Sequence, residues 1–144
     1  MKLLTKAFGE IDISEKQRLI FKNGIFGFED ITNFALLDTA DNSPFYWLQS
    51  EKSKNIAFLL IDPKIVYPDY ELEVDSFDLE ELEIENAEDI IVLSIVTLHE
   101  NPIESTINLL GPIVLNKKKH FGKQAINKNE NYTVRNPLIK DKEV

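Results

Sequence analysis

The chain has 144 residues, of which 43% are hydrophobic and 28% are charged. At roughly 100–200 residues per domain, this length predicts one domain that folds without a disulfide or a metal. The composition excludes a fully disordered or fibrous protein. Cysteine is absent, which excludes disulfides, thiolate metal sites and cysteine nucleophiles.

The longest apolar run, residues 90–98, is only nine residues long and contains Ser94 and Thr97. A membrane-spanning helix needs about 20 apolar residues. The first six residues include two lysines and no apolar core of the kind found in a secretory signal. We therefore expect a cytoplasmic protein that does not bind a membrane.

The charge is distributed unevenly. The net charge of −9 argues against nucleic-acid binding through the overall field. Residues 65–116 contain 13 acidic and no basic residues, whereas residues 117–144 contain eight basic and three acidic residues. An acidic block attracts basic partners and repels RNA. The alternative is a solvated face without a partner.

Short runs of strand-forming residues between turn signals predict an all-β protein, a small antiparallel, sandwich-like β-barrel with one or two short helices. We expect this single domain to cover residues 1–138. The chain should fray from residue 136 into a flexible tail at 139–144. In chain order, strands are expected at residues 3–8, 9–13, 17–21, 34–37, 45–49, 56–61, 69–75, 90–98, 106–116, 124–126 and 132–134.

Three local signals refine this pattern. Asn23 and Gly24 predict a tight turn, because both residues tolerate positive φ. Residues 76–84, preceded by an N-cap at Asp75 or Ser76, predict a helix of about two turns. Gly111-Pro112 interrupts the strand at 106–116, and because proline cannot donate to a ladder, the strand must bulge there or lie at an edge.

Residues 69–75 alternate strictly between acidic and apolar side chains. This alternation predicts a half-buried strand, because a period of two sends alternate side chains to opposite faces. The acidic face, which we call the carboxylate stripe, consists of Asp69, Glu71, Glu73 and Asp75. It is our candidate surface for a basic partner, with a solvated face as the alternative.

We expect no catalytic residues, no metal and no cofactor. The only two histidines, His99 and His120, have no partner at ligand spacing. The stripe also lacks the Asp-x-Asp-x-Asp-Gly turn that wraps calcium. Residues 117–123 form a basic cluster with an aromatic beside it, for which an RNA contact and a solvated loop are both open interpretations.

Several motifs together resemble the FliW family of flagellar assembly factors. They follow the family's order across residues 1–138: NGIFGFE at 23–29, SPF at 43–45 with LQS at 48–50, NLLGPIVLN at 108–116 followed by lysines, and GKQAI at 122–126 with Tyr132. One position departs from the family's pattern, because Phe26 stands where a proline is expected.

The resemblance implies a small β-barrel that is not an enzyme and is a monomer when free. Proteins similar to this one bind CsrA, a small dimeric RNA-binding repressor of flagellin translation, and they also bind flagellin. The two partners compete, so that export of flagellin frees the factor to bind CsrA and relieve the repression of flagellin mRNA. An acidic block docked beside the RNA-binding surface of CsrA would also lower its affinity for RNA.

Two contact surfaces follow as hypotheses. The carboxylate stripe would dock CsrA. The terminal helical region of flagellin would lay an apolar face against the interrupted strand, at Leu109, Leu110, Pro112 and Ile113. Three alternatives stay open: these leucines are ordinary core, the acidic block binds another basic protein, or the chain is a small RNA-binding barrel that uses residues 117–123.

Overall fold

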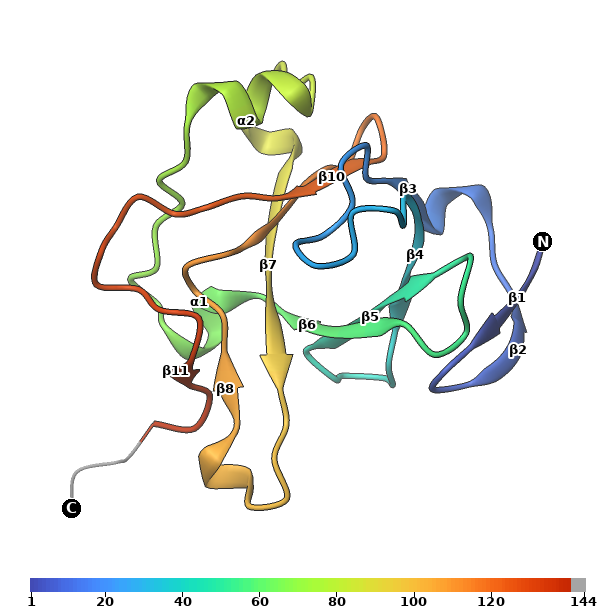
Figure 1. The fold of residues 1–144 in the computed structure, drawn as a ribbon, viewed down its shortest axis with the longest axis horizontal. Helices are drawn as coiled ribbons and strands as arrows, with labels where there is room; N and C mark the ends of the chain where they lie inside the picture. Colours follow the sequence, from blue (N-terminus) through green and yellow to red (C-terminus); the bar gives the residue numbers. More distant parts are fainter. Residues whose placement is uncertain (141–144) are drawn as a thin grey trace.

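A computed structural model of the chain describes residues 1–140. Its centre is a closed barrel of seven strands (Figure 1). Around the ring these strands are β3 (Arg18–Ile20), β4 (Asn33–Asp38), β5 (Phe45–Ser50), β6 (Ala57–Ile61), β7 (Ile90–Thr97), β9 (Ile113–Asn116) and β10 (Phe121–Gln124). The structure therefore confirms the predicted small β-barrel.

One pair of neighbouring strands is parallel. Six of the seven pairs in the ring are antiparallel, and β3 and β10 close it in parallel. The closing contact includes a hydrogen bond of 2.9 Å from the Ile20 N–H to the His120 carbonyl oxygen. In an up-and-down ring with an odd number of strands, the first and last strands must point the same way. The predicted antiparallel barrel therefore contains one parallel pair, which the sequence pattern did not indicate.

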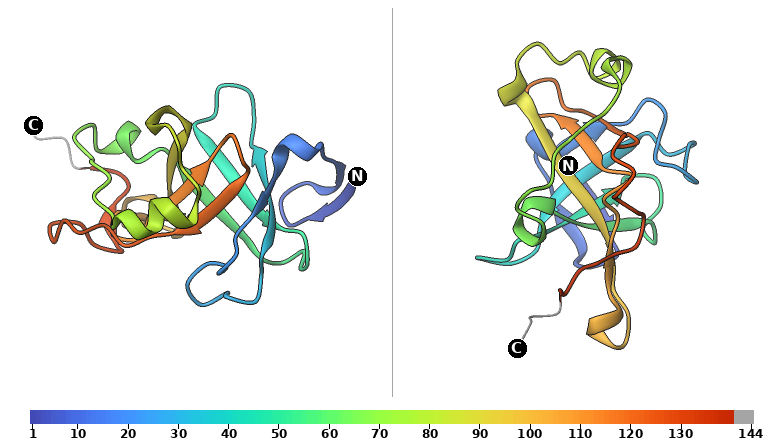
Figure 2. Two further views of the ribbon diagram at one scale, coloured as in Figure 1. Left: turned by 90° about the horizontal axis from the view of Figure 1, so that it is seen from above. Right: turned by 90° about the vertical axis from the view of Figure 1, so that its left-hand side faces the viewer.

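The remaining elements lie at the two sides of the barrel (Figure 2). A separate hairpin of β1 (Lys2–Thr5) and β2 (Gly9–Asp12) lies at the side of the N-terminus. The other side carries α1 (Pro63–Val66), α2 (Ser76–Glu81) and β11 (Asn136–Pro137). The chain also forms the short strand β8 (Thr106–Ile107) and three 3-10 helices, η1 (Glu15–Gln17), η2 (Ala87–Asp89) and η3 (Pro102–Glu104). No helix within residues 1–140 is long and apolar enough to cross a membrane.

The barrel is filled by aromatic and branched aliphatic side chains. Phe21 and Phe34 are fully buried and pack edge to face, with ring centroids 5.0 Å apart. Gly122 of β10 lies directly against Phe21, where an added Cβ would overlap the ring and lie 2.8 Å from Leu115 Cδ2. The buried cluster consists of Leu19, Phe21, Ile25, Ile31, Phe34, Leu48, Leu60, Leu93, Ile113 and Leu115.

The interruption at Gly111-Pro112 is a large bulge, as predicted. Strand β7 pairs Val96 with Ile107 of β8 and then Leu93 with Ile113 of β9. Between these two pairs, β7 advances by three residues and its neighbour by six, so three residues are looped out. The loop is ordered by a hydrogen bond of 2.7 Å from the Gly111 N–H to Asn108 Oδ1.

Two predicted strands are absent from residues 1–140, and the strand expected at 124–126 lies earlier in the chain, as β10 at Phe121–Gln124. Asp69 lies in a turn, residues 70–75 pair with no other strand, and residues 132–134 are irregular. Fraying from residue 136 is also wrong, because Asn136 and Pro137 form β11 against β8. A two-residue strand carries no periodic signal, so only the tertiary structure reveals it. Of the predicted tail at 139–144, residues 141–144 lie outside the described residues.

Candidate functional site

The connection from β6 to β7 carries most of the acidic block. We call its residues 67–89 the acidic crossover. It leaves α1 as an extended segment, continues as α2 and enters β7 through η2 (Figure 1). Its apolar side chains pack against the outer surface of the barrel at Val114 and Ala125. These crossover side chains are Leu72, Val74, Leu82 and Ile84.

The carboxylate stripe faces solvent, as the alternation predicts. Tyr70 is buried, Leu72 and Val74 are half-buried, and all four acidic side chains of the stripe are exposed. The backbone of the segment is held by hydrogen bonds to residues 127–132 instead of a strand ladder. The Lys128 N–H donates to the Glu73 carbonyl oxygen at 2.6 Å, and Asn127 Nδ2 donates to the Glu71 carbonyl oxygen at 2.8 Å.

Buried amide side chains fix the loops around this surface. Asn116 Nδ2 donates to the carbonyl oxygens of Leu82 and Glu83 at 2.8 and 3.2 Å. Its Oδ1 accepts from the N–H groups of Lys118 and Lys119 at 3.0 and 3.2 Å. One side chain at the end of β9 therefore holds both the end of α2 and the lysine loop.

Gln124 joins two other loops. Its Nε2 donates to the Gly111 carbonyl oxygen at 2.9 Å, and its Oε1 accepts from the Phe26 N–H at 3.0 Å. The sequence interpretation assigned no role to Asn116, Gln124 or Asn127. All three lie inside or next to the motifs NLLGPIVLN and GKQAI, and this position was the one sequence feature that could have indicated their structural role.

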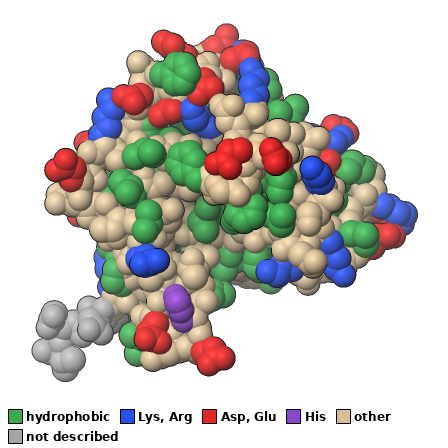
Figure 3. Space-filling model, viewed as in Figure 1, with side chains coloured by type: hydrophobic (Ala, Val, Ile, Leu, Met, Phe, Trp, Pro, Cys, Tyr) green, Lys and Arg blue, Asp and Glu red, His purple; other side chains and the backbone are tan. Residues whose placement is uncertain are grey.

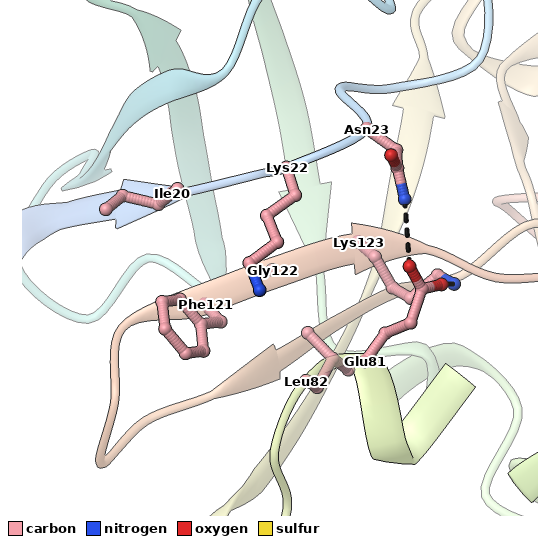
Figure 4. Close-up of a pocket in the computed structure, with 8 residues that line it drawn as sticks. All are labelled: Ile20, Lys22, Asn23, Glu81, Leu82, Phe121, Gly122 and Lys123. Atoms are coloured by element: carbon pink, nitrogen blue, oxygen red, sulfur yellow. Dashed lines mark hydrogen bonds and ion pairs between the residues drawn. The ribbon is translucent and has the colours of Figure 1, made fainter. Parts of the chain in front are cut away.

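The acidic and basic blocks pair with each other. Lys123 of β10 contacts Asp78 at 2.6 Å and Glu81, both on α2. Figure 4 shows Glu81 reaching from α2 toward Lys123 and toward Asn23, whose Nδ2 donates to Glu81 Oε2 at 3.1 Å. The adjoining hollow holds only about 10 Å³, room for one water molecule. These residues therefore fasten α2 and do not form a ligand site.

Two further lysines extend this pairing. Lys119 contacts Glu83 at 3.1 Å and Glu85 at 3.8 Å. Lys128 contacts Asp75 at 2.7 Å. The carboxylate stripe is therefore reduced to three members that take part in no ion pair within residues 1–140, namely Asp69, Glu71 and Glu73. In the basic cluster, Lys119 and Lys123 are paired, while Lys117 and Lys118 are exposed.

The ion pairs shift the pKa values of several residues that form them. Burial alone would lower the pKa of Lys123, but its hydrogen bonds to Asp78 and Glu81 raise that pKa above its ordinary value. The hydrogen bond from Lys123 lowers the pKa of Glu81, and the hydrogen bond to Asp75 raises the pKa of Lys128. Each shift favours the charged form that the pairing requires.

The four residues expected to contact flagellin lie at the bulge, but most of their surface is inside the protein. Leu109 and Ile113 are fully buried, and Pro112 is buried beside them. Leu110 alone is half-buried. The looped-out residues turn Leu109 toward Ile61, Tyr70, Val96 and Ile107, so the alternative of ordinary core describes its side chain in this conformation.

His120 lies in the lysine loop between β9 and β10, and His99 lies between β7 and η3. The ring of His120 lies with Nδ1 3.2 Å from the Arg18 carbonyl oxygen. The backbone N–H of His99 donates to Ser105 Oγ at 3.1 Å. Within residues 1–140, no group of three or more histidine and acidic residues is arranged to hold a metal ion.

The conformation of the loop at residues 24–29 explains why a proline is expected at the position of Phe26. The Phe28 N–H donates to the Ile25 carbonyl oxygen at 2.6 Å, and Gly27 has a φ of +88°. These features define a type II turn, in which proline is favoured at the position of Phe26. Phe26 keeps the turn and adds an N–H donor, which proline lacks. That donor is the group that Gln124 accepts from.

Comparison with known proteins agrees with this geometry. The family model for the FliW protein matches residues 2–138. The flagellar assembly factor FliW of Bacillus licheniformis is 40% identical over 138 residues, which cover 96% of each chain. That of Leptospira biflexa is 39% identical over 140 residues, 96% of this chain and 92% of the relative. A crystal structure of a flagellar assembly factor FliW superimposes with a TM-score of 0.91 at 37% identity, over 99% of this chain and all of that one. The chain belongs to the FliW family of flagellar assembly factors.

Proposed function

We propose that this chain is a non-enzymatic, cytoplasmic assembly factor that binds CsrA and flagellin in alternation. Flagellin that awaits export occupies the factor. After its secretion, the free factor binds CsrA and relieves the repression of flagellin mRNA. The proposed factor uses no metal or cofactor, is a monomer when free, and binds neither nucleic acid nor membrane. Membership of a family of flagellar assembly factors supports this proposal.

The observation that carries the CsrA proposal is the outward face of residues 69–73. Asp69, Glu71 and Glu73 are exposed and unpaired among the described residues, on a backbone that hydrogen bonds hold to residues 127–132. Alternate residues of an extended chain are about 6–7 Å apart. A row of carboxylates at this spacing presents a fixed negative field to a basic RNA-binding protein. The same field disfavours RNA.

For flagellin, we place the contact at the bulge, where Leu110 is half-buried and Leu109, Pro112 and Ile113 are buried. An amphipathic helix binds such a surface through burial of its apolar face. Apolar burial is insensitive to salt screening and gives a negative heat-capacity change. Flagellin binding should therefore change little between 0.05 and 0.5 M salt, roughly the range in which charge pairs become screened.

Charge reversal with a matched control tests the CsrA contact. The triple variant Asp69→Lys, Glu71→Lys, Glu73→Lys should associate with CsrA about tenfold more slowly at 0.05 M salt, because exposed charges mainly set the encounter rate. The control reverses three exposed acids outside residues 69–75, Glu88, Glu100 and Glu104, and so makes the same change in net charge. Equal association rates for the two variants would contradict a specific role of the stripe.

Affinity capture from the host lysate tests the proposal as a whole. CsrA and flagellin should both be recovered, and adding purified flagellin should displace CsrA. Recovery of neither partner would overturn the proposal. A parallel titration with labelled RNA should show no binding. Tight RNA binding that Lys117→Glu and Lys118→Glu abolish would support the RNA-binding alternative in its place.

A further inference from the structure

A shallow groove lies beside α2, at the end of the carboxylate stripe. Its apolar side is formed by Phe26, Ala125 and Ile126, and its charged side by Asp75, Asp78 and Lys123. Phe26 and Ile126 are 53% and 59% exposed. Figure 3 shows apolar side chains gathered across the middle of this face, with acidic side chains at the top over α2.

The walls of the groove are held in place by polar contacts. Gln124 accepts from the Phe26 N–H, and the Ala125 N–H donates to the Pro112 carbonyl oxygen at 2.9 Å. Lys123 holds Asp78 at 2.6 Å on the opposite wall. Large apolar side chains that are exposed next to one another, as Phe26 and Ile126 are in this groove, are typical of surfaces that bind another molecule.

The size and charge of the groove restrict its occupant. Its volume of about 270 Å³ is at the lower limit for small-molecule sites, which measure about 300–1,000 Å³. Such a space fits one or two side chains from a protein surface. Lys128 and Lys123 pair with Asp75 and Asp78. A preference for basic residues next to those side chains therefore comes from the unpaired carboxylates of the adjoining stripe, Glu71 and Glu73. Asp75 is paired with Lys128, but Glu73, two residues before it, is exposed and unpaired among the described residues, so the groove adjoins the stripe.

We propose that this groove receives an apolar side chain from the same basic protein partner that the carboxylate stripe attracts. The inference rests on the proposed function, which supplies CsrA as that partner. The stripe and the groove then have separate roles. Exposed charges set the rate of encounter, whereas a buried apolar anchor sets the lifetime of the complex.

The test compares two double variants, each of which replaces two exposed large apolar side chains. Phe26→Ser with Ile126→Ser alters the groove. Leu98→Ser with Ile103→Ser alters the β7–β8 connection, where the two side chains are 62% and 66% exposed. Association and dissociation rate constants for purified CsrA are measured by surface plasmon resonance at 0.05 and 0.5 M NaCl.

The groove variant should dissociate from CsrA at least tenfold faster at both salt concentrations, with an association rate constant within twofold of the wild type. The control should keep both rate constants within twofold. Because all four side chains are exposed, the melting temperatures should agree. If the groove double variant does not fold, Ile126→Ser alone is expected to show a dissociation rate at least threefold faster.

The outcomes separate the two proposals. Failure of the wild-type chain to bind CsrA overturns the proposed function. Binding by the wild type, with unchanged dissociation in the groove variant, overturns the groove inference alone. Loss of flagellin binding with unchanged CsrA kinetics also overturns it. The groove inference is also overturned if sedimentation shows that the wild type is a dimer and the groove variant is a monomer, while the CsrA kinetics are unchanged. The occupant of the groove is then a second copy of the chain.

Discussion

The barrel and the acidic crossover both contain segments in which side chains alternate between two faces, yet their backbones are held differently. Strands β5 and β6 pair residue by residue from Phe45 with Ile61 to Gln49 with Ala57. Residues 69–75 alternate strictly between acidic and apolar side chains, but their backbone is held by residues 127–132, and Lys128 pairs with Asp75. An alternating sequence therefore predicts that one face of the segment is buried. It does not predict which other segment forms hydrogen bonds with its backbone.

The two regions should consequently respond to different perturbations. The barrel is stabilised mainly by apolar burial, which depends little on pH or salt. The crossover combines a thin apolar face with ion pairs and buried amides, whose contributions depend on protonation and on intact partners. Damage to the barrel should unfold the chain as a whole, whereas damage to the crossover should release that segment locally.

The largest effect is expected from a cavity in the barrel. Phe34→Ala removes a fully buried ring that packs against Phe21 and Phe58. We expect a loss of about 3–5 kcal/mol in the free energy of unfolding, a typical cost of a large-to-small core substitution. Urea denaturation measures it. A loss below about 1 kcal/mol would show that the barrel interior is not the main source of stability.

The second effect separates the crossover from the barrel. Asn116→Ala leaves the carbonyl oxygens of Leu82 and Glu83 without their donor, and we expect a loss of about 1–3 kcal/mol. Hydrogen exchange should accelerate mainly at residues 78–84 and 118–119. Asn55→Ala, at an exposed asparagine, is the matched control and should change neither quantity. Uniform acceleration across the barrel strands would contradict a local role for Asn116.

Much of the fold was predictable because the barrel strands carry their own local signals. Turn residues and apolar runs predicted β4 to β7 within a few residues, and the proline predicted the bulge before β9. The closing parallel pair of β3 and β10 was not predictable from local pattern, because it depends on the total number of strands. The two-residue strand β11 is likewise set by its contact with β8.

The candidate site was predictable only in part. The outward direction of Asp69, Glu71 and Glu73 followed from their spacing. The pairing of Asp75 with Lys128 did not, because the partners are 53 positions apart and the contact depends on how the crossover folds back. The two oppositely charged blocks suggested an external partner for each, whereas the tertiary structure first pairs them with each other.

The third prediction uses pH to distinguish the regions. The hydrogen bond from Lys123 lowers the pKa of Glu81 below its ordinary value of 4.5, so its stabilisation is present above pH 4.5 and is lost as the pH falls through the lowered pKa. Glu81→Gln should cost about 0.2–1 kcal/mol at pH 7, the range of partly exposed ion pairs, and less at pH 3, where Glu81 is more protonated. Urea denaturation at both pH values measures this difference. An equal cost at both would contradict the assignment to the charged pair.

The smallest effect concerns the loop that joins both regions. Phe26→Pro suits the type II turn and lowers the entropy of the unfolded chain, a gain of about 0.4–1 kcal/mol. It also removes the N–H that donates to Gln124, a loss of about 0.5–1.5 kcal/mol. The two effects nearly cancel, so the free energy of unfolding should change by less than about 0.5 kcal/mol.

A double-mutant cycle resolves this cancellation. In a Gln124→Leu background the hydrogen bond is already absent, and Phe26→Pro should then stabilise the protein by the full entropic gain of about 0.4–1 kcal/mol. Ile25 forms an isolated β-bridge with Phe28, and the extended backbone of a bridge is the conformation that a residue before proline prefers. Urea denaturation of the four proteins measures the coupling. Destabilisation by proline in both backgrounds would mean that the turn, and not the hydrogen bond to Gln124, is what phenylalanine preserves at this position.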